Sequence, residues 1–120
     1  MRQVKSQNPE LLALIRSLRK KAKEHDAQVW RDVAHSLSAS KRRRVAMNIS
    51  RLNRHTKEKD TVVVPGKVLG AGTLEHPLVV AAFAFSDEAR AKIVRVKGKC
   101  VSISQLMEDN LKGSNVKIME

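Results

Sequence analysis

The strongest constraint on the fold is a strand, cap and helix pattern that recurs in the second half of the chain. Residues 48–53 (Asn-Ile-Ser-Arg-Leu-Asn) and residues 102–107 (Ser-Ile-Ser-Gln-Leu-Met) agree at isoleucine, serine and leucine. In each copy a valine, Val62 or Val116, follows the capping position by 14 residues. The serine and glutamine of the second copy also fit a capping box. Each unit therefore predicts a short strand, a capped helix and another strand.

A looser third copy consists of an apolar strand over residues 78–85, the cap Ser86 and a helix that begins with Asp87-Glu88. Alternation along this strand puts Phe83 and Phe85 on one face and small residues on the other, so both faces need a cover. Strands joined through a helix run roughly parallel. The pattern predicts an α/β fold, an irregular stack of strand and helix layers.

The first 44 residues predict two helices. Asn8-Pro9-Glu10 has the order of a helix start, with an Asx cap, a proline and an acid, and apolar residues then recur at helical spacing. Asp26 is expected to cap a second helix over about residues 27–37, which has a wide apolar face. Trp30 is expected in the core on this face, with stacking on a nucleic-acid base as the alternative.

The charge of the chain favours a polyanionic partner. Its 120 residues include 24 Lys and Arg against 12 Asp and Glu, for a net charge of +12. Residues 1–60 hold 16 basic and 6 acidic side chains, and residues 61–120 hold 8 and 6. A hydrophobic fraction of 42% indicates a folded core, so nucleic acid bound by a globular protein is the leading hypothesis. We expect one domain, residues 1–120, with a basic two-helix N-terminal arm (1–44) and a strand–helix core (45–120).

Other classes of protein have little support. The longest apolar run, residues 78–85, is too short to cross a bilayer as a helix, and the N-terminus lacks the layout of a secretory signal. One cysteine, Cys100, favours a reducing compartment. The four histidines lack metal-ligand spacing, and the adjacent Asp87 and Glu88 suit a helix start better than acid–base catalysis. We therefore expect no enzyme activity, cofactor, metal, membrane or small-molecule substrate, and a cytoplasmic location.

Cations occur in two arrangements that suit phosphate binding. Four on the first helix recur at helical spacing beside the apolar stripe. Four adjacent cations follow the second helix, and their mutual repulsion is best relieved by phosphates. A solvated face, or for the adjacent cations a localisation signal, is the alternative. These candidate residues are Arg16, Arg19, Lys20, Lys23, Lys41, Arg42, Arg43 and Arg44.

A glycine-rich segment, residues 65–72 (Pro-Gly-Lys-Val-Leu-Gly-Ala-Gly), invites comparison with phosphate loops. Val68 stands where a P-loop has Ser or Thr, so nucleotide binding is disfavoured. As a loop after a strand, the segment offers the backbone at Gly66 and the side chain of Lys67 to an RNA phosphate, with a plain turn as the alternative.

A helix-turn-helix DNA-binding regulator is the main alternative function. The two N-terminal helices and the basic run are compatible with it. The connection between the helices lacks the usual glycine, however, and cations spread over helix, linker and loop suit an irregular RNA surface better than one groove. The scarcity of aromatic residues disfavours RRM or OB platforms, and the single cysteine disfavours a zinc finger.

Several motifs are spread over nearly the whole chain. They are Asn8-Pro9, Val29-Trp30, Asn48-Ile49-Ser50-Arg51, Arg54, Val62-Val63-Val64-Pro65-Gly66-Lys67-Val68-Leu69-Gly70 and Gly113-Ser114. Through these motifs the chain resembles the large-subunit ribosomal protein family numbered eighteen in archaea and eukaryotes, and its length is similar to that of archaeal members. The departure is Val45-Ala46-Met47, where relatives often carry an acidic residue before the asparagine.

The resemblance implies a non-catalytic protein that binds large-subunit ribosomal RNA beside other ribosomal proteins and helps the subunit to assemble. It also implies an irregular strand-strand-helix superhelix, which the bacterial large-subunit family numbered fifteen shares. The residues that it implicates in RNA binding are Arg42, Arg43, Arg51, Arg54 and Pro65-Gly66-Lys67.

Overall fold

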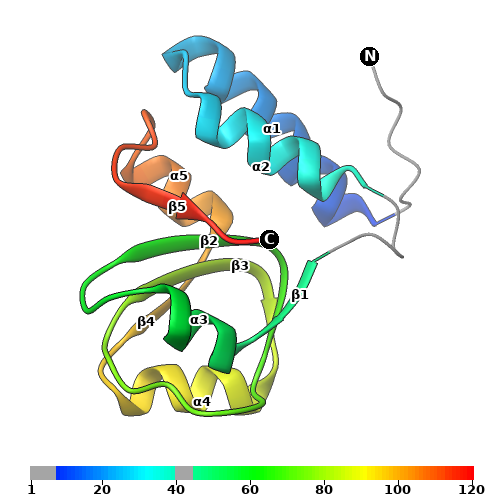
Figure 1. Ribbon diagram of the computed structural model, residues 1–120. Coiled ribbons are helices and arrows are strands. Elements are labelled where there is room, and N and C mark those ends of the chain that lie inside the picture. The colour runs from blue at the N-terminus through cyan, green and yellow to red at the C-terminus, as the bar shows by residue number, and fades with distance from the viewer. Residues whose placement is uncertain (1–7, 40–44) are drawn as a thin grey trace.

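Five short strands form one parallel sheet in the computed structural model, which describes residues 8–39 and 45–120 (Figure 1). The strand order is β1-β2-β3-β4, and β5 also pairs with β2. β3 pairs with one edge of β2, and both β5 and β1 pair with the opposite edge. Along that edge β5 lies beside residues 61–63 and β1 beside residues 66–69. The α/β class is confirmed. The strands are β1 (Val45–Asn48), β2 (Thr61–Leu69), β3 (Val79–Phe85), β4 (Lys99–Ser102) and β5 (Val116–Ile118).

Three of the five helices follow strands, as the repeated pattern predicts. They are α3 (Ile49–His55), α4 (Asp87–Arg95) and α5 (Ile103–Asp109). Ser86 and Ser102 cap α4 and α5, since each side-chain oxygen accepts a hydrogen bond from the backbone N–H three residues later, at 3.1 and 3.0 Å. Asn48 occupies the corresponding position before α3, but its side chain makes no capping hydrogen bond.

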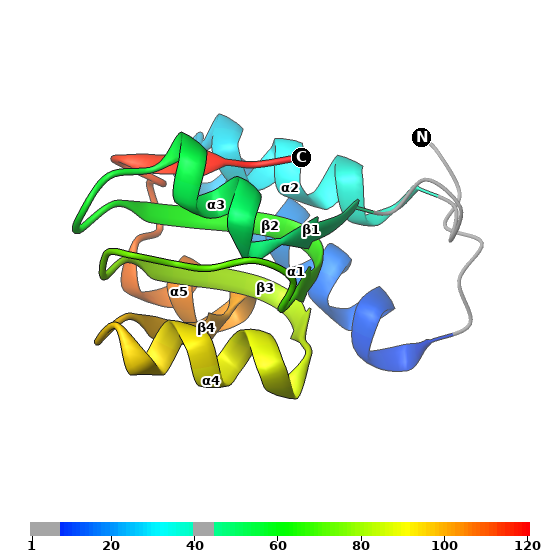
Figure 2. The same ribbon diagram turned by 60° about the horizontal axis from the view of Figure 1, so that its bottom comes forward.

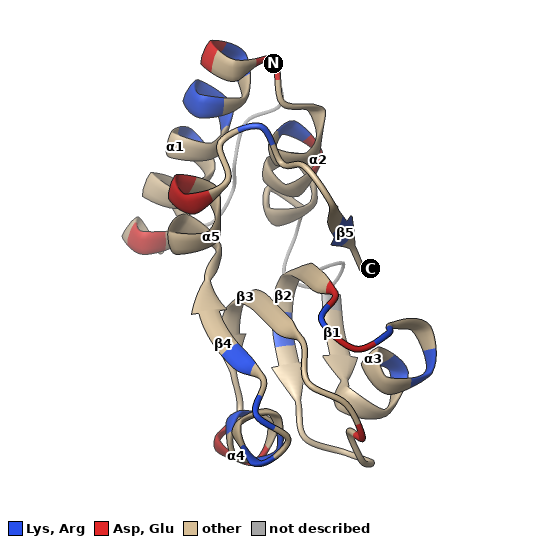
Figure 3. Ribbon diagram, turned by 90° about the vertical axis from the view of Figure 1, so that its left-hand side faces the viewer, with Lys and Arg blue, Asp and Glu red and all other residues tan. Residues whose placement is uncertain are grey.

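The other two helices, α1 (Pro9–His25) and α2 (Gln28–Leu37), run side by side as an antiparallel pair (Figures 1 and 3). Asn8 caps α1 as predicted. The expected cap of α2 is wrong, because Asp26 is instead the left-handed residue that ends α1, with φ 49°, and Ala27 takes the cap position without a side-chain hydrogen bond. The chain reverses too soon after α1 for Asp26 to serve the next helix.

Each side of the sheet is covered by its own helices and its own apolar core (Figure 2). On the side that we call the α1 side, α1, α2 and α5 cover the sheet, and the buried residues Leu18, Trp30 and Met107 pack with Val63 of β2. The two N-terminal helices therefore contribute buried residues to the α1-side core. Among the described residues, no helix is long and apolar enough to cross a membrane.

On the opposite side, called the α3 side, α3 and α4 cover the sheet. Leu52 of α3 and Ile93 of α4 pack there with Val62, Val64 and Val80 of the central strands. Successive residues of β2 thus enter different cores, which is why residues 62–64 are all buried although the sequence does not alternate.

Two sequence expectations fail around an irregularity in β2. Residues 65–67 lie inside this strand and not in a loop, and the register with β3 shifts between Val64 and Lys67. Phe85 packs against the α3-side core while Phe83 packs against the α1-side core, so the two rings, expected on one face, contact different cores. A bulge of this kind adds local twist, which a strict two-residue period does not include.

Candidate nucleic-acid interface

The cations of α1 stand on the helix face that the core leaves free. Leu11, Ile15, Leu18 and Ala22 are buried at helical spacing, and this fixes the rotation of α1 about its axis. Arg16, Lys20 and Lys23 are consequently exposed, and Arg19 is half-buried. The predicted stripe therefore exists as a surface.

Arg51 and Arg54 form a second cationic position, on α3. Burial of Ile49 and Leu52 holds this short helix against the sheet, and both arginines are exposed. In Figure 3, α1 and α3 lie on opposite sides of the sheet. The structure therefore divides these candidate residues between the α1 side and the α3 side and does not gather them into one patch.

The candidates of β2 differ from each other. Lys67 is exposed, and its position in the sheet is fixed by pairing with Ala46 and Ala84 on its two sides. Gly66 is buried and pairs with Val45, so it lacks the free loop backbone that the sequence suggested. Lys41, Arg42, Arg43 and Arg44 lie outside the described residues.

The exposed candidates are free of acidic partners within residues 8–39 and 45–120. In the described part of the chain, the ion pairs are Lys21–Glu24 at 3.7 Å, Lys92–Glu88 at 2.9 Å and Lys117–Asp60 at 3.1 Å. None of them includes Arg16, Arg19, Lys20, Lys23, Arg51, Arg54 or Lys67. Acidic side chains thus neutralise other lysines and leave the candidate cations to an external anion.

Sequence reasoning missed the cations of α4. Arg90 and Arg95 are exposed and, within the described part of the chain, neither has an acidic partner. Arg90 lies over the ring of Phe85, 5.1 Å from its centroid. The sequence does contain a cluster of basic residues in this helix, Arg90, Lys92 and Arg95. These residues follow an acidic first turn, which is typical of a helix start and does not itself indicate a cationic surface.

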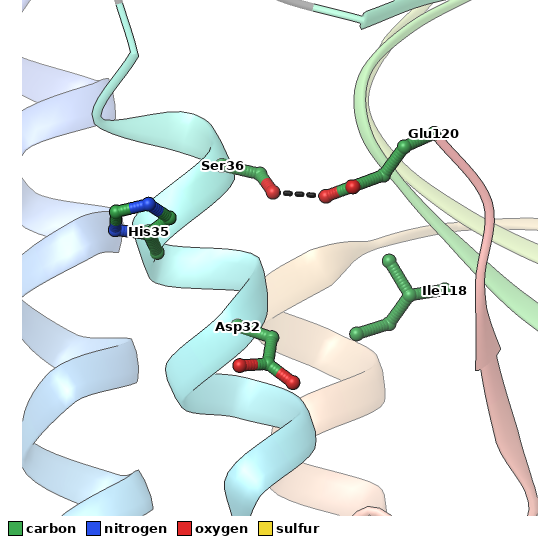
Figure 4. A pocket seen from close by; sticks show the side chains of 5 residues that line it. All are labelled: Asp32, His35, Ser36, Ile118 and Glu120. Atoms are coloured by element: carbon green, nitrogen blue, oxygen red, sulfur yellow. Dashed lines mark hydrogen bonds between the residues drawn. The ribbon is translucent and has the colours of Figure 1, made fainter.

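A hollow between α2 and the C-terminal segment is lined partly by acidic side chains, unlike the basic surfaces described above (Figure 4). It has a volume of about 510 Å³ and is lined by Asp32, His35, Ser36, Ile118 and Glu120. Ser36 Oγ donates a hydrogen bond to the Glu120 carboxylate. Two carboxylates repel phosphate, so this hollow is not part of a surface for nucleic acid. Among the described residues, no group of three or more His, Cys, Asp or Glu side chains is arranged to hold a metal.

The structure tests two alternatives that the sequence left open, a stacking role for Trp30 and a helix-turn-helix fold for the first two helices. Trp30 is fully buried, and its Nε1 donates a hydrogen bond to the carbonyl oxygen of Asn110 at 2.9 Å, so the stacking role is wrong and the core role is confirmed. A helix-turn-helix crosses its helices at a steep angle, whereas α1 and α2 lie side by side and pack on a sheet (Figure 1). Nothing in the fold supports a DNA-binding regulator.

Fold and charge together define a class: a small basic α/β protein that holds solvent-facing cations on both sides of a parallel sheet. The comparisons with known proteins identify the family within this class. The family model for ribosomal protein 60S L18 and 50S L18e matches residues 1–120, and the chain belongs to this family. It is a family of ribosomal proteins and not of enzymes, and the resemblance seen in the sequence is confirmed.

Curated relatives match the sequence of this chain over almost their whole length. Large ribosomal subunit protein eL18 of Methanothermobacter thermautotrophicus is 47% identical over 120 residues, which cover 100% of this chain and 99% of the relative. The protein of the same name from Methanospirillum hungatei is 44% identical over 93% of each chain, and that from Methanococcus maripaludis is 42% identical over 99% of each. The chain is thus a structural protein of the large ribosomal subunit, with archaeal relatives.

Proposed function

We propose that this chain binds large-subunit ribosomal RNA in the cytoplasm, beside neighbouring ribosomal proteins, and supports assembly of the subunit without catalysing a reaction or using a cofactor. The observation that carries the proposal is a contrast between two groups of cations. Lys21, Lys92 and Lys117 have acidic partners, whereas the exposed cations of α1, α3 and β2 have none among the described residues.

Fixed and unneutralised cations suit phosphate binding for an electrostatic reason. Holding like charges close together raises the free energy of the folded protein, and RNA phosphates relieve that repulsion while counterions leave the RNA. Contacts of this kind position a protein on RNA and read little sequence. The proposed contacts are Arg16, Arg19, Lys20, Lys23, Lys41, Arg42, Arg43, Arg44, Arg51, Arg54 and Lys67, with Gly66 contributing only by its place in the strand.

The two-sided distribution supports a position between RNA segments. The cations of α1 and those of α3 lie on helices that cover opposite sides of the sheet, so an RNA helix lying flat on one side would meet only one of the two groups. We therefore propose that the domain bridges two RNA elements, which is how a protein without catalytic groups contributes to assembly.

The salt dependence of binding tests the proposal. We expect the affinity for protein-free large-subunit rRNA to fall by about 10³ or more between roughly 50 and 200 mM salt if about eight phosphates are neutralised. Filter binding measures this directly. A nearly flat salt response would overturn the proposal, as would the absence of the chain from large subunits purified at low salt.

A further inference from the structure

A small pocket opens at the carboxyl ends of β3 and β4. Its volume is about 150 Å³. The lining includes the two phenylalanines of the chain, Phe83 and Phe85, with Arg90, Cys100 and Gln105. Phe83, Phe85 and Cys100 are each half-buried, so the pocket reaches the surface.

The lining combines one cation, two aromatic rings and neutral polar groups. The Arg90 guanidinium lies 5.1 Å from the centroid of the Phe85 ring. The side-chain amide of Gln105 makes no hydrogen bond within residues 8–39 and 45–120, and its two donors and one acceptor are available. None of the described lining residues is a carboxylate. The positive charge of the pocket thus favours an anionic ligand, and its aromatic rings favour a ligand with a flat ring.

We propose that this pocket takes one unpaired nucleobase of ribosomal RNA, stacked against Phe85 and Arg90 with its edge facing Gln105. The inference rests on the proposed function, because it takes rRNA as the ligand. A cavity of about 150 Å³ accommodates a single six-membered ring, and drug-sized ligands need at least about 300 Å³. Unpaired bases stacked on aromatic and guanidinium planes are a usual way of recognising single-stranded RNA.

A protein segment is the other occupant to consider, since β4 is an edge strand whose outer edge is unpaired among the described strands. β4 has only four residues and begins with Lys99. Short edges that carry lysine resist the addition of another strand. The features of the pocket therefore favour a base over a peptide.

Cys100 provides a reporter inside the pocket, because the chain has one cysteine. We expect alkylation of Cys100 by N-ethylmaleimide to slow at least about tenfold when the protein is bound to protein-free large-subunit rRNA. Burial raises the pKa of the Cys100 thiol, so labelling is done at mildly alkaline pH, where more thiolate is present.

Variants separate the pocket from general electrostatic binding. Phe85→Leu keeps an apolar side chain but removes the ring, and it should weaken rRNA binding roughly tenfold without changing the salt slope, since it removes no charge. Arg90→Gln and Arg95→Gln each remove one cation of α4, and both should lower the slope slightly. Of the two arginine variants, only Arg90→Gln should remove the protection of Cys100 from alkylation, measured against the rate of the same variant without rRNA. Thermal melting checks that each variant is folded.

The outcomes distinguish this inference from the function on which it rests. Retained rRNA binding with full alkylation of Cys100 overturns the pocket and leaves the proposed function standing. Protection seen only in the complete subunit, and not with rRNA alone, assigns the pocket to a neighbouring protein and also overturns the inference. Failure of the wild-type chain to bind rRNA overturns both.

Discussion

The ammonium of Lys92 lies 2.7 Å from the carbonyl oxygen of Gly70, so a side chain of α4 holds the start of the loop between β2 and β3. The same ammonium lies 2.8 Å from the carbonyl oxygen of Gly72 and 2.9 Å from the Glu88 carboxylate. A Cβ at Gly70 would lie 2.8 Å from the backbone nitrogen of Ala89, which shows how closely the loop approaches α4. This loop connects two adjacent strands and contains no helix. Its backbone is instead held in place by the hydrogen bonds that Lys92 donates to it.

Lys92→Met should lower the free energy of unfolding by about 1–2 kcal/mol. The substitution leaves two carbonyl groups without their charged donor, and hydrogen bonds to charged groups are stronger than neutral ones. Urea denaturation measures the difference. Lys20→Met is the matched control, because Lys20 is exposed and has no acidic partner in the described part of the chain, and it should change stability by less than about 0.5 kcal/mol. Equal effects of the two substitutions would contradict the role of Lys92.

The double variant Arg16→Gln, Lys20→Gln should weaken rRNA binding and lower the salt slope by about 1.5, since each phosphate contact contributes roughly 0.7–0.9. Arg51→Gln, Arg54→Gln should do the same on the α3 side. If the two sides contact different RNA elements, the two losses of binding free energy should add when all four substitutions are combined. Filter binding over a salt series measures the slopes.

The control for these variants is Lys21→Gln. Lys21 lies on α1 but pairs with Glu24 at 3.7 Å, so its removal should leave the slope nearly unchanged. None of the variants should alter the melting temperature, because the substituted side chains are largely outside the core. A slope equal to that of the wild type in both double variants would mean that the α1 and α3 cations do not reach phosphate.

Local patterns in the sequence predicted most of the fold. The serine caps of α4 and α5 and the apolar stripe of α1 depend on residues three or four positions apart, and all of these predictions are confirmed. The bulge in β2 and the burial of Gly66 were not predictable, because they depend on pairing with β1 and β3 from other parts of the chain.

The candidate interface was predictable as a list of cations but not as a surface. Helical spacing gave the exposure of Arg16 and Lys20, while only the order of the strands shows that α1 and α3 lie on opposite sides of the sheet. The pocket at Phe85 joins residues from β3, α4, β4 and α5, and no spacing in the sequence brings these together.

Trp30→Phe should lower the free energy of unfolding by about 2 kcal/mol. The substitution removes the indole N–H that donates to the Asn110 carbonyl at 2.9 Å, and it leaves a gap in the α1-side core. Because Asn110 ends α5, the loss should also loosen the segment that leads to β5. Urea denaturation gives the stability, and amide exchange at residues 116–118 reports on the segment. A change below about 0.5 kcal/mol would mean that the indole contributes packing that Phe fully replaces.

Asp60 should make the stability of the protein depend on acid pH. Its Oδ2 accepts a hydrogen bond from the backbone N–H of Lys57 at 2.8 Å and another from Lys117 Nζ at 3.1 Å. The backbone hydrogen bond first, and then the Lys117 side chain, lower the pKa of Asp60 from its ordinary value of 3.8. A lowered pKa in the folded state means that the unfolded chain takes up the proton first as the pH falls.

The stabilisation by Asp60 should therefore be fully present above 3.8 and disappear as the pH falls below this value towards the pKa of the folded state. Asp60→Asn tests this, because it removes the charge and keeps the shape. Urea midpoints of the two proteins should differ near neutral pH and converge well below 3.8. Lys117→Met should shrink the difference without abolishing it, because the backbone N–H of Lys57 still donates to the carboxylate. A difference that stays constant over the whole acid range would show that the ionisation of Asp60 does not contribute to folding.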